Sequence, residues 1–132
     1  MRYMLDTNIC IYLIKKKPAG VIRRLQSLRI SDVSLSSITL AELEYGVEKS
    51  QRPDQNRWAL TEFLSPLDIL SFDAAAAQRY GAIRSRLEKS GKVIGSMDLL
   101  IAAHALSLGA VLVTNNASEF RRVEELTVEN WV

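Results

Sequence analysis

Acidic and amide side chains recur where apolar segments of this chain give way to helices. Carboxylate and amide oxygens are the ligands that Mg²⁺ and Mn²⁺ prefer, and acids gathered at one point repel one another unless a cation lies between them. The residues that we predict to form such a catalytic site are Asp6, Glu42, Asp98, Asn116 and Glu119. The carboxylates of Asp6, Glu42 and Asp98 are the candidate metal ligands, and no cluster of Cys and His indicates zinc.

Two of the acids follow strands predicted in the first third of the chain. Residues 3–5 form a short apolar run with Asp6 directly after it, and Glu42 lies in the first turns of the helix that follows a second strand at 33–36. In a parallel sheet every strand-to-helix turn lies at the carboxyl edge, where ligands usually bind. We therefore expect Asp6 and Glu42 to share that edge.

The other candidates lie in the last third of the chain. Asp98 is in the first turn of an apolar helix predicted over 96–108, where a carboxylate is costly unless something cationic satisfies it. Asn116 and Glu119 follow a strand predicted over 110–114, which is apolar on both faces. We treat all of these positions as equivalent strand-to-helix turns and expect them to meet in one pocket.

Helix capping is the alternative role for each candidate. Asp6 has the residue type of an N-cap, and an acid in a first turn is favoured by the helix dipole. Three pairs have the spacing or the residue types of such caps, namely Thr39 with Glu42, Ser96 with Asp98, and Asn116 with Glu119. Recurrence of the acids at similar turns favours the metal site over capping.

Strands that alternate with helices predict an α/β protein with a mainly parallel sheet covered on both faces. The predicted strands are 3–5, 33–36, 67–72, 110–114 and an edge strand at 126–128. The predicted helices are 7–17, 21–28, 37–49, 57–64, 73–90, 96–108 and a short one within 115–123, with a loop at 50–56. No repeat or linker divides the chain, so we expect a single domain over residues 1–132.

Composition narrows the function classes further. The chain has 132 residues, of which 48% are hydrophobic, and no run suits a membrane span or a signal peptide. One cysteine, Cys10, predicts a reducing, cytoplasmic location and a core position. The lone His104 is predicted to be structural. The net charge of +2 permits a polyanionic partner, and two roles stay open for the basic residues, solvated faces or backbone contacts, at Lys15–Lys17, Arg23, Arg24, Arg84, Arg86, Lys89, Lys92, Arg121 and Arg122.

Three segments carry a resemblance to a known family. MLDTNICIYLIK, SSITLAELEYGVEKS and IGSMDLLIAAHALSLGAVLVTNNASEF resemble the PIN domain, and within it the VapC toxins of type II toxin–antitoxin pairs. The resemblance implies a PIN-like three-layer α/β/α fold with a four- to five-stranded sheet, and a Mg²⁺- or Mn²⁺-dependent endoribonuclease. Asp6, Glu42 and Asp98 fall on the acidic metal-site positions of that family. Many relatives have an acid at the position of Asn116. Because Asn supplies a neutral oxygen, this difference bears on whether a second metal ion binds.

The resemblance also implies partners. RNA is the implied substrate, hydrolysed to a 3′-hydroxyl and a 5′-phosphate, and the enteric and plasmid-type members are implied to cut initiator tRNA in its anticodon loop. A VapB-type antitoxin is implied to direct an Arg or Lys toward the acidic pocket, with DNA reached only through the antitoxin and no membrane involved. A homodimer within a larger toxin–antitoxin assembly is implied, and Ile9, Leu13, Ile38 and Tyr45 are the interface residues that we predict.

Two rival functions compete with this one. A phosphoryl-transfer domain of the haloacid dehalogenase type also has an Asp after its first strand, but it needs a second Asp where this chain has Asn8. A catalytically weak PIN fold that binds RNA or protein without cutting is favoured only by Asn116. The sequence itself specifies neither the RNA target nor the antitoxin.

Overall fold

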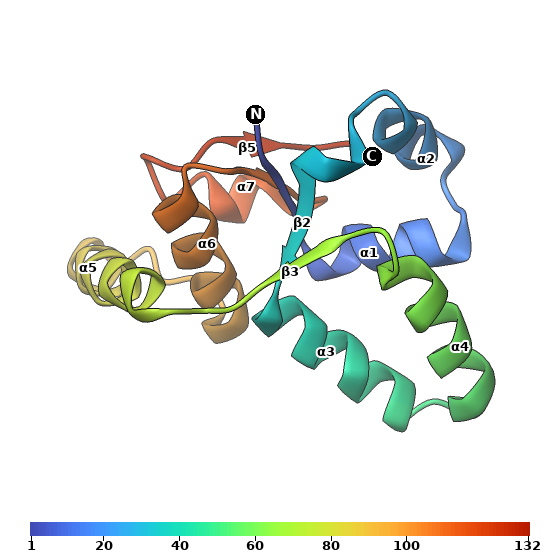
Figure 1. Cartoon of the computed structure of the whole chain (residues 1–132). Helices are drawn as coiled ribbons and strands as arrows, with labels where there is room; N and C mark the ends of the chain where they lie inside the picture. The colour runs from blue at the N-terminus through green and yellow to red at the C-terminus, as the bar shows by residue number, and fades with distance from the viewer.

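The computed structural model describes residues 1–132 and consists of one parallel sheet between two layers of helices (Figure 1). All strand pairs are parallel, and the strand order is β3-β2-β1-β4-β5. The strands are β1 (Tyr3–Leu5), β2 (Val33–Ser36), β3 (Asp68–Leu70), β4 (Val111–Val113) and β5 (Val128–Glu129). The predicted α/β/α fold class with a five-stranded sheet is therefore confirmed.

The helices lie on both faces of this sheet. Helices α1 to α4 cover one face, and α5 and α6 cover the other, so that the sheet is enclosed as parallel sheets require (Figure 1). The α-helices are α1 (Thr7–Lys15), α2 (Ala19–Gln26), α3 (Ser37–Glu48), α4 (Pro53–Leu64), α5 (Ala74–Ser90), α6 (Ser96–Leu108) and α7 (Ala117–Phe120), with a 3₁₀ turn at Ile30–Asp32. None of them combines the length and apolarity that crossing a membrane requires.

Alternation along the central strands divides the interior into two cores. Tyr3 and Leu5 of β1 face the core under α1 to α4, whereas Met4 faces the core under α5 and α6. Val113 and Leu112 of β4 divide in the same way. Because β1 and β4 are apolar on both faces and occupy the middle of the sheet, they hold its carboxyl edge rigidly.

The start of α4 differs from the sequence prediction. The sequence predicts a loop over 50–56 and a helix from residue 57, whereas α4 begins at Pro53. Proline at the first helical position loses no hydrogen bond, and its fixed φ suits a helix start. The polar residues at 53–56, which suggest a loop, are exposed to solvent on α4. Leu60 is the only buried residue of this helix.

Two of the residues predicted to form a dimer interface are in the wrong place. Ile9 is fully buried and Leu13 is nearly so, both in the core under α1 to α4. A helical apolar stripe cannot by itself distinguish a core face from an interface face. Tyr45 is exposed, and Ile38 packs partly against the other core, so only these two stay available to a partner.

Candidate active site

Asp6 is the buried centre of the predicted site. Leu5 is in register with Val113, so Asp6 and Thr114 leave the central strands side by side. Thr114 Oγ1 donates to Asp6 Oδ2 at 2.7 Å, and the Thr7 amide donates to Asp6 Oδ1, also at 2.7 Å. Asp6 is only 4% exposed and is the N-cap of α1. The capping role is thus real, yet it occupies only one carboxylate oxygen, and the other lies at the sheet edge beside Thr114.

Glu42 is tied to the same point through Thr7. Thr7 Oγ1 donates to Glu42 Oε1 at 2.5 Å, which joins α1 to α3 across the carboxyl edge. The capping box predicted for Thr39 and Glu42 is wrong, because α3 begins at Ser37 and Ser36 caps it by accepting from the Ile38 amide. Glu42 therefore lies beyond the first turn, where its carboxylate has no capping function.

Asp98 reaches the edge by a different path from the one predicted. Helix α6 follows α5 through residues 91–95 and not a strand, so its position is not a strand-to-helix turn. A methyl group at Gly95 would lie 3.6 Å from Asp98 Oδ2 and 3.9 Å from Glu119 Oε1, so both acids face the space beside this glycine. Gly95 is the N-cap of α6 and supplies no side-chain cap, which rules out the Ser96 capping alternative.

Asn116 and Glu119 close the set of contacts. Asn116 Nδ2 donates to Glu119 Oε2 at 2.5 Å, and Glu119 Oε1 accepts from the Gly95 amide at 2.9 Å. The Asn116 amide donates in turn to Thr114 Oγ1 at 3.0 Å. The capping box expected from this pair is not made, because Asn116 forms no side-chain cap. Hydrogen bonds thereby connect Asp6, Glu42, Asn116 and Glu119 around one part of the carboxyl edge, and Asp98 faces the same space beside Gly95.

The site acids carry negative charge that nothing in the chain neutralises. None of the five salt bridges of the structure includes Asp6, Glu42, Asp98 or Glu119. Burial raises the pKa of Asp98 to about 6, and the charges of Asp6, Glu119 and Glu42 act in the same direction. Burial likewise raises the pKa of Asp6, against the hydrogen bonds from Thr114 and Thr7 that lower it. Excess negative charge at a sheet edge is an arrangement that favours a cation.

The donor set fits a hard divalent cation, although no ligand cage is preformed. No three Asp, Glu, His or Cys side chains converge closely enough to hold a metal ion unaided. Mg²⁺ does not need such a cage, because it retains several waters and is commonly held by one or two carboxylates together with substrate phosphate. Asp6 and Asp98 fit that role best, since Asp6 is central and the Asp98 side chain makes no hydrogen bond within the chain. Glu42 and Glu119 are held by donors at either side.

Three residues that position the site were not predicted. Thr7 and Thr114 orient Asp6 and connect it to Glu42 and Asn116, and Gly95 binds Glu119. Threonines within two residues of the ends of two central strands are the signal that the sequence offers. The structural role predicted for His104 agrees with its buried position, where Nδ1 lies 2.7 Å from Ser36 Oγ. Cys10 is a buried core residue, as expected.

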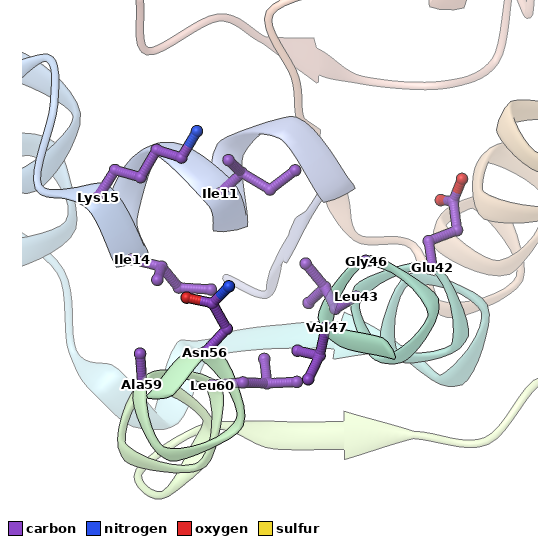
Figure 2. Close-up of a pocket in the computed structure, with 10 residues that line it drawn as sticks. All are labelled: Ile11, Ile14, Lys15, Glu42, Leu43, Gly46, Val47, Asn56, Ala59 and Leu60. Atoms are coloured by element: carbon purple, nitrogen blue, oxygen red, sulfur yellow. The ribbon is translucent and has the colours of Figure 1, made fainter. Parts of the chain in front are cut away.

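An apolar groove begins at Glu42 and runs between α1, α3 and α4. Figure 2 shows Glu42 at one end and Lys15 at the other, with Ile11 and Ile14 on α1 opposite Leu43 and Val47 on α3. The groove has a volume of about 280 Å³. We call this feature the apolar groove; its further lining residues are Gly46, Asn56, Ala59 and Leu60.

Comparison with known proteins gives the class to which this geometry belongs. The PIN domain family model matches residues 3–126, and the chain therefore belongs to the PIN-domain family, in its VapC ribonuclease branch. It is 49% identical over 132 residues to Ribonuclease VapC2 of Rickettsia felis, covering 99% of this chain and 98% of the relative. It is 48% identical to the tRNA(fMet)-specific endonuclease VapC of Shigella flexneri, with 99% and 98% coverage.

A solved structure agrees with the sequence comparison. The crystal structure of VapBC2 from Rickettsia felis, bound to a DNA fragment from the promoter, superposes with a TM-score of 0.94 at 47% identity, and each chain is covered completely. The family predicted from the three motifs is confirmed. The haloacid dehalogenase alternative is correspondingly wrong, since the position that it needs as an acid is Asn8, and Asn8 bonds to Asn115 beside the site.

Proposed function

We propose that this chain is the toxin of a VapBC-type pair and hydrolyses RNA phosphodiester bonds with Mg²⁺ or Mn²⁺, acting as a single PIN domain over residues 1–132. The observation that carries the proposal is the set of unneutralised carboxylates around Asp6, drawn from α3, α6, α7 and the end of β1. An RNA strand cannot approach this charge without a cation. The same acids therefore account for metal dependence and for the position of cleavage.

The chain's own residues have distinct roles in this proposal. Asp6 and Asp98 hold the cation, and Thr7 and Thr114 fix the orientation of Asp6 by hydrogen bonds to its two oxygens. Glu42, held by Thr7, and Glu119, held by Gly95 and Asn116, orient the water shell on either side. When bound, the divalent ion supplies charge neutralisation at the phosphate and a nucleophile at neutral pH.

Asn116 acts on Glu119 and not on the cation in this arrangement. Its amide nitrogen points to Glu119, so the departure from the family's acid is compensated by a neighbour that keeps its own charge. This favours a cutting enzyme over the rival hypothesis of a catalytically weak module that only binds RNA or protein. One tightly held metal suffices for the proposal.

Cleavage of a labelled single-stranded RNA in Mn²⁺ tests the function directly. We expect EDTA to abolish cleavage, and Asp6→Asn, Glu42→Gln and Asp98→Asn each to lower the rate at least about 100-fold, because each removes a group that holds or orients the cation. Glu62→Gln is the matched control, since Glu62 is an exposed acid on α4 whose side chain forms no hydrogen bond or salt bridge. Intact RNA with the native protein, or equal rates for the three variants and the control, would refute the assignment.

The antitoxin is proposed to inhibit by lying in the apolar groove. The groove offers aliphatic side chains to an amphipathic segment and ends at Glu42, where an Arg or Lys of that segment would pair with the site acids in a partly buried environment. Crystal structures of relatives are of VapBC complexes, some with DNA, so we infer that this chain reaches DNA through its antitoxin. A homodimer, within a larger assembly, uses exposed faces such as that of Tyr45.

The RNA target is proposed by similarity to a named relative. The Shigella flexneri protein is called a tRNA(fMet)-specific endonuclease, and initiator tRNA cut in its anticodon loop is the target that we propose here. A single-stranded loop presents both bases and backbone to a shallow site, whereas duplex RNA hides them. A substrate of this kind places the protein in the cytoplasm. Cleavage of purified tRNAs, followed by mapping of the 5′ ends, tests the choice.

A further inference from the structure

A second groove lies behind α7, and the proposed chemistry does not use it. It is formed by the C-terminal end of α5, the segment after it, α7 and the residues following α7, and its volume is about 320 Å³. We call it the basic groove, because four of its eight lining residues are cations and only one is an acid. The residues that matter here are Arg86, Lys92, Arg121, Arg122, Glu124 and the single apolar one, Leu87.

The positive charge of this groove exceeds what the chain as a whole would predict. The protein has 17 basic and 15 acidic residues, a net charge of only +2, so charge is concentrated here while the rest of the surface is nearly balanced. Arg86 pairs with Glu125, and Arg122 donates to the Val93 carbonyl, which holds both guanidinium groups in place. Lys92 and Arg121 are exposed and form no salt bridge or side-chain hydrogen bond. They are therefore available to a ligand.

The basic groove adjoins the acidic site. Ser118 lines the groove, whereas its neighbour Glu119 turns to the site and accepts from the Gly95 amide. Lys92 also lines the groove, three residues before Gly95, whose amide is the donor to Glu119. Helix α7 and the residue after it thus place Glu119 at the site and Arg121 in the groove, and the loop at 91–95 places the Gly95 amide at the site and Lys92 in the groove.

We propose that the basic groove binds the phosphate backbone of the RNA strand whose scissile bond lies at the acidic site, and that it supplies most of the electrostatic attraction for substrate. This inference rests on the proposed ribonuclease function. Guanidinium groups match phosphate oxygens in geometry and charge. The groove has no aromatic side chain for base stacking, so it contributes affinity without reading sequence.

The composition of the groove also argues against a protein segment as its occupant. Protein interfaces are anchored by apolar and aromatic side chains in desolvated pockets. Here one apolar residue, Leu87, stands among polar ones, in contrast to the six hydrophobic residues that line the apolar groove. A flexible polyanion needs fixed cations along its path and little else.

Salt-dependent binding tests this assignment without cleavage. Asp98→Asn protein in EDTA is titrated with a labelled single-stranded oligoribonucleotide at several salt concentrations. Adding Lys92→Gln and Arg121→Gln together should weaken RNA binding about tenfold near physiological salt. The slope of log K against log salt should become less steep by about 1.4, which is about 0.7 for each lost phosphate contact. The matched control is Arg2→Gln with Arg29→Gln, since both exposed residues precede strands of the parallel sheet and so lie at its opposite edge.

A cleavage assay separates this inference from the proposed function. In otherwise native protein with Mn²⁺, Lys92→Gln with Arg121→Gln should raise KM for a long RNA while kcat stays near the native value. If the native protein cuts RNA but this pair behaves like the Arg2 and Arg29 control, the groove assignment is overturned and the ribonuclease stands. If the pair loses antitoxin binding and keeps RNA binding, the groove holds protein and the assignment is again wrong. If the native protein neither binds nor cuts RNA, both fall together.

Discussion

The apolar groove and the basic groove are similar in volume, and each adjoins one end of the same acidic site, yet their surfaces are opposite in character. The apolar groove ends at Glu42 and is lined mostly by aliphatic side chains from α1, α3 and α4. The basic groove adjoins Glu119 and is lined mostly by charged and polar ones from the segments around α5 and α7. A hydrophobic surface discriminates by shape and burial, whereas a cationic one attracts any polyanion. We infer that inhibitor and substrate approach the acids from different sides.

A leucine in the apolar groove should produce the largest difference between the roles of the two grooves, because it should weaken antitoxin binding and leave RNA binding unchanged. Gly46 lies in α3 and lines the groove, and a Cβ there would meet no atom within 4 Å, so Gly46→Leu projects into the groove without straining the fold. We expect antitoxin affinity to fall about 100-fold, the loss typical when a central interface anchor is displaced. Isothermal titration with the purified antitoxin measures it.

The control for this variant is another helical glycine. Gly81 lies on the exposed surface of α5, and a Cβ at this position would likewise meet no atom within 4 Å. Gly81→Leu should leave antitoxin and RNA binding unchanged, and Gly46→Leu should leave RNA binding in EDTA unchanged. Loss of RNA binding in Gly46→Leu, with antitoxin affinity intact, would show that the roles of the two grooves are reversed.

Acid should affect the site and the basic groove differently. The pKa of Asp98 is raised to about 6, so this carboxyl group becomes neutral as the pH falls through that value and can no longer hold a cation. The cleavage rate at subsaturating Mn²⁺ should fall by up to about tenfold for each pH unit below about 6 and be level above it. RNA binding in EDTA should stay level or strengthen over the same range, because protonation of Asp98 removes a negative charge that repels RNA.

Parallel pH series of single-turnover cleavage and of RNA binding check this expectation. Glu62→Gln serves again as the control, because its carboxyl group is exposed on α4 and far in sequence from the site. Should RNA binding in EDTA fall together with cleavage below pH 6, the acids themselves contact RNA, and the division of labour between site and groove is incorrect.

The sequence predicts the acidic side chains of the candidate site but not the groups that hold them. Asp6, Glu42 and Glu119 are charged residues near the ends of apolar runs, and such a pattern is visible in one dimension. Thr7 and Thr114 are ordinary residue types whose importance depends on the register of Leu5 with Val113. Register between strands more than a hundred residues apart is a property of tertiary structure, and no local pattern reports it.

The basic groove likewise could not be predicted from the sequence, because it depends on tertiary packing. Arg86, Lys92 and Arg121 were recognised as basic, but a solvated face and a phosphate site have the same sequence until packing brings α5 and α7 together. The sequence does not specify the start of α4, because Pro53 can either break a helix or begin one. The sequence predicts Asp98 at a strand-to-helix turn, whereas its helix α6 follows the helix α5, and Asp98 lies near the other acids through packing of α6.

The smallest expected effect concerns stability and again contrasts the two regions. Without metal, the site acids oppose one another, and the raised pKa of Asp98 means that the folded state binds a proton there more tightly than the unfolded state does. Stability from this group is therefore greatest at low pH and is lost as the pH rises from about 4 through about 6. Asp98→Asn removes the repulsion at nearly constant size. At pH 7 in EDTA it should melt about 2 to 5 °C above the native protein, a modest gain because Asp98 is partly exposed and water screens its charge.

Three controls, in pH, in metal and in the position of the substitution, test whether charge repulsion causes this rise in Tm. At pH 4 the native Asp98 is largely neutral, so the difference in Tm from Asp98→Asn should nearly vanish. Saturating Mn²⁺ should raise the Tm of the native protein because it binds only the folded site, and it should raise that of Asp98→Asn much less. In the basic groove, Lys92→Gln with Arg121→Gln should change Tm little under any of these conditions, since both side chains are exposed and unpaired.

If Asp98 only favours the start of α6, Asp98→Asn should instead lower Tm, because loss of a first-turn acid weakens the helix. If Asp98→Asn melts below the native protein in EDTA and Mn²⁺ shifts neither, the acids do not form a metal site, and the proposed metal-dependent chemistry fails.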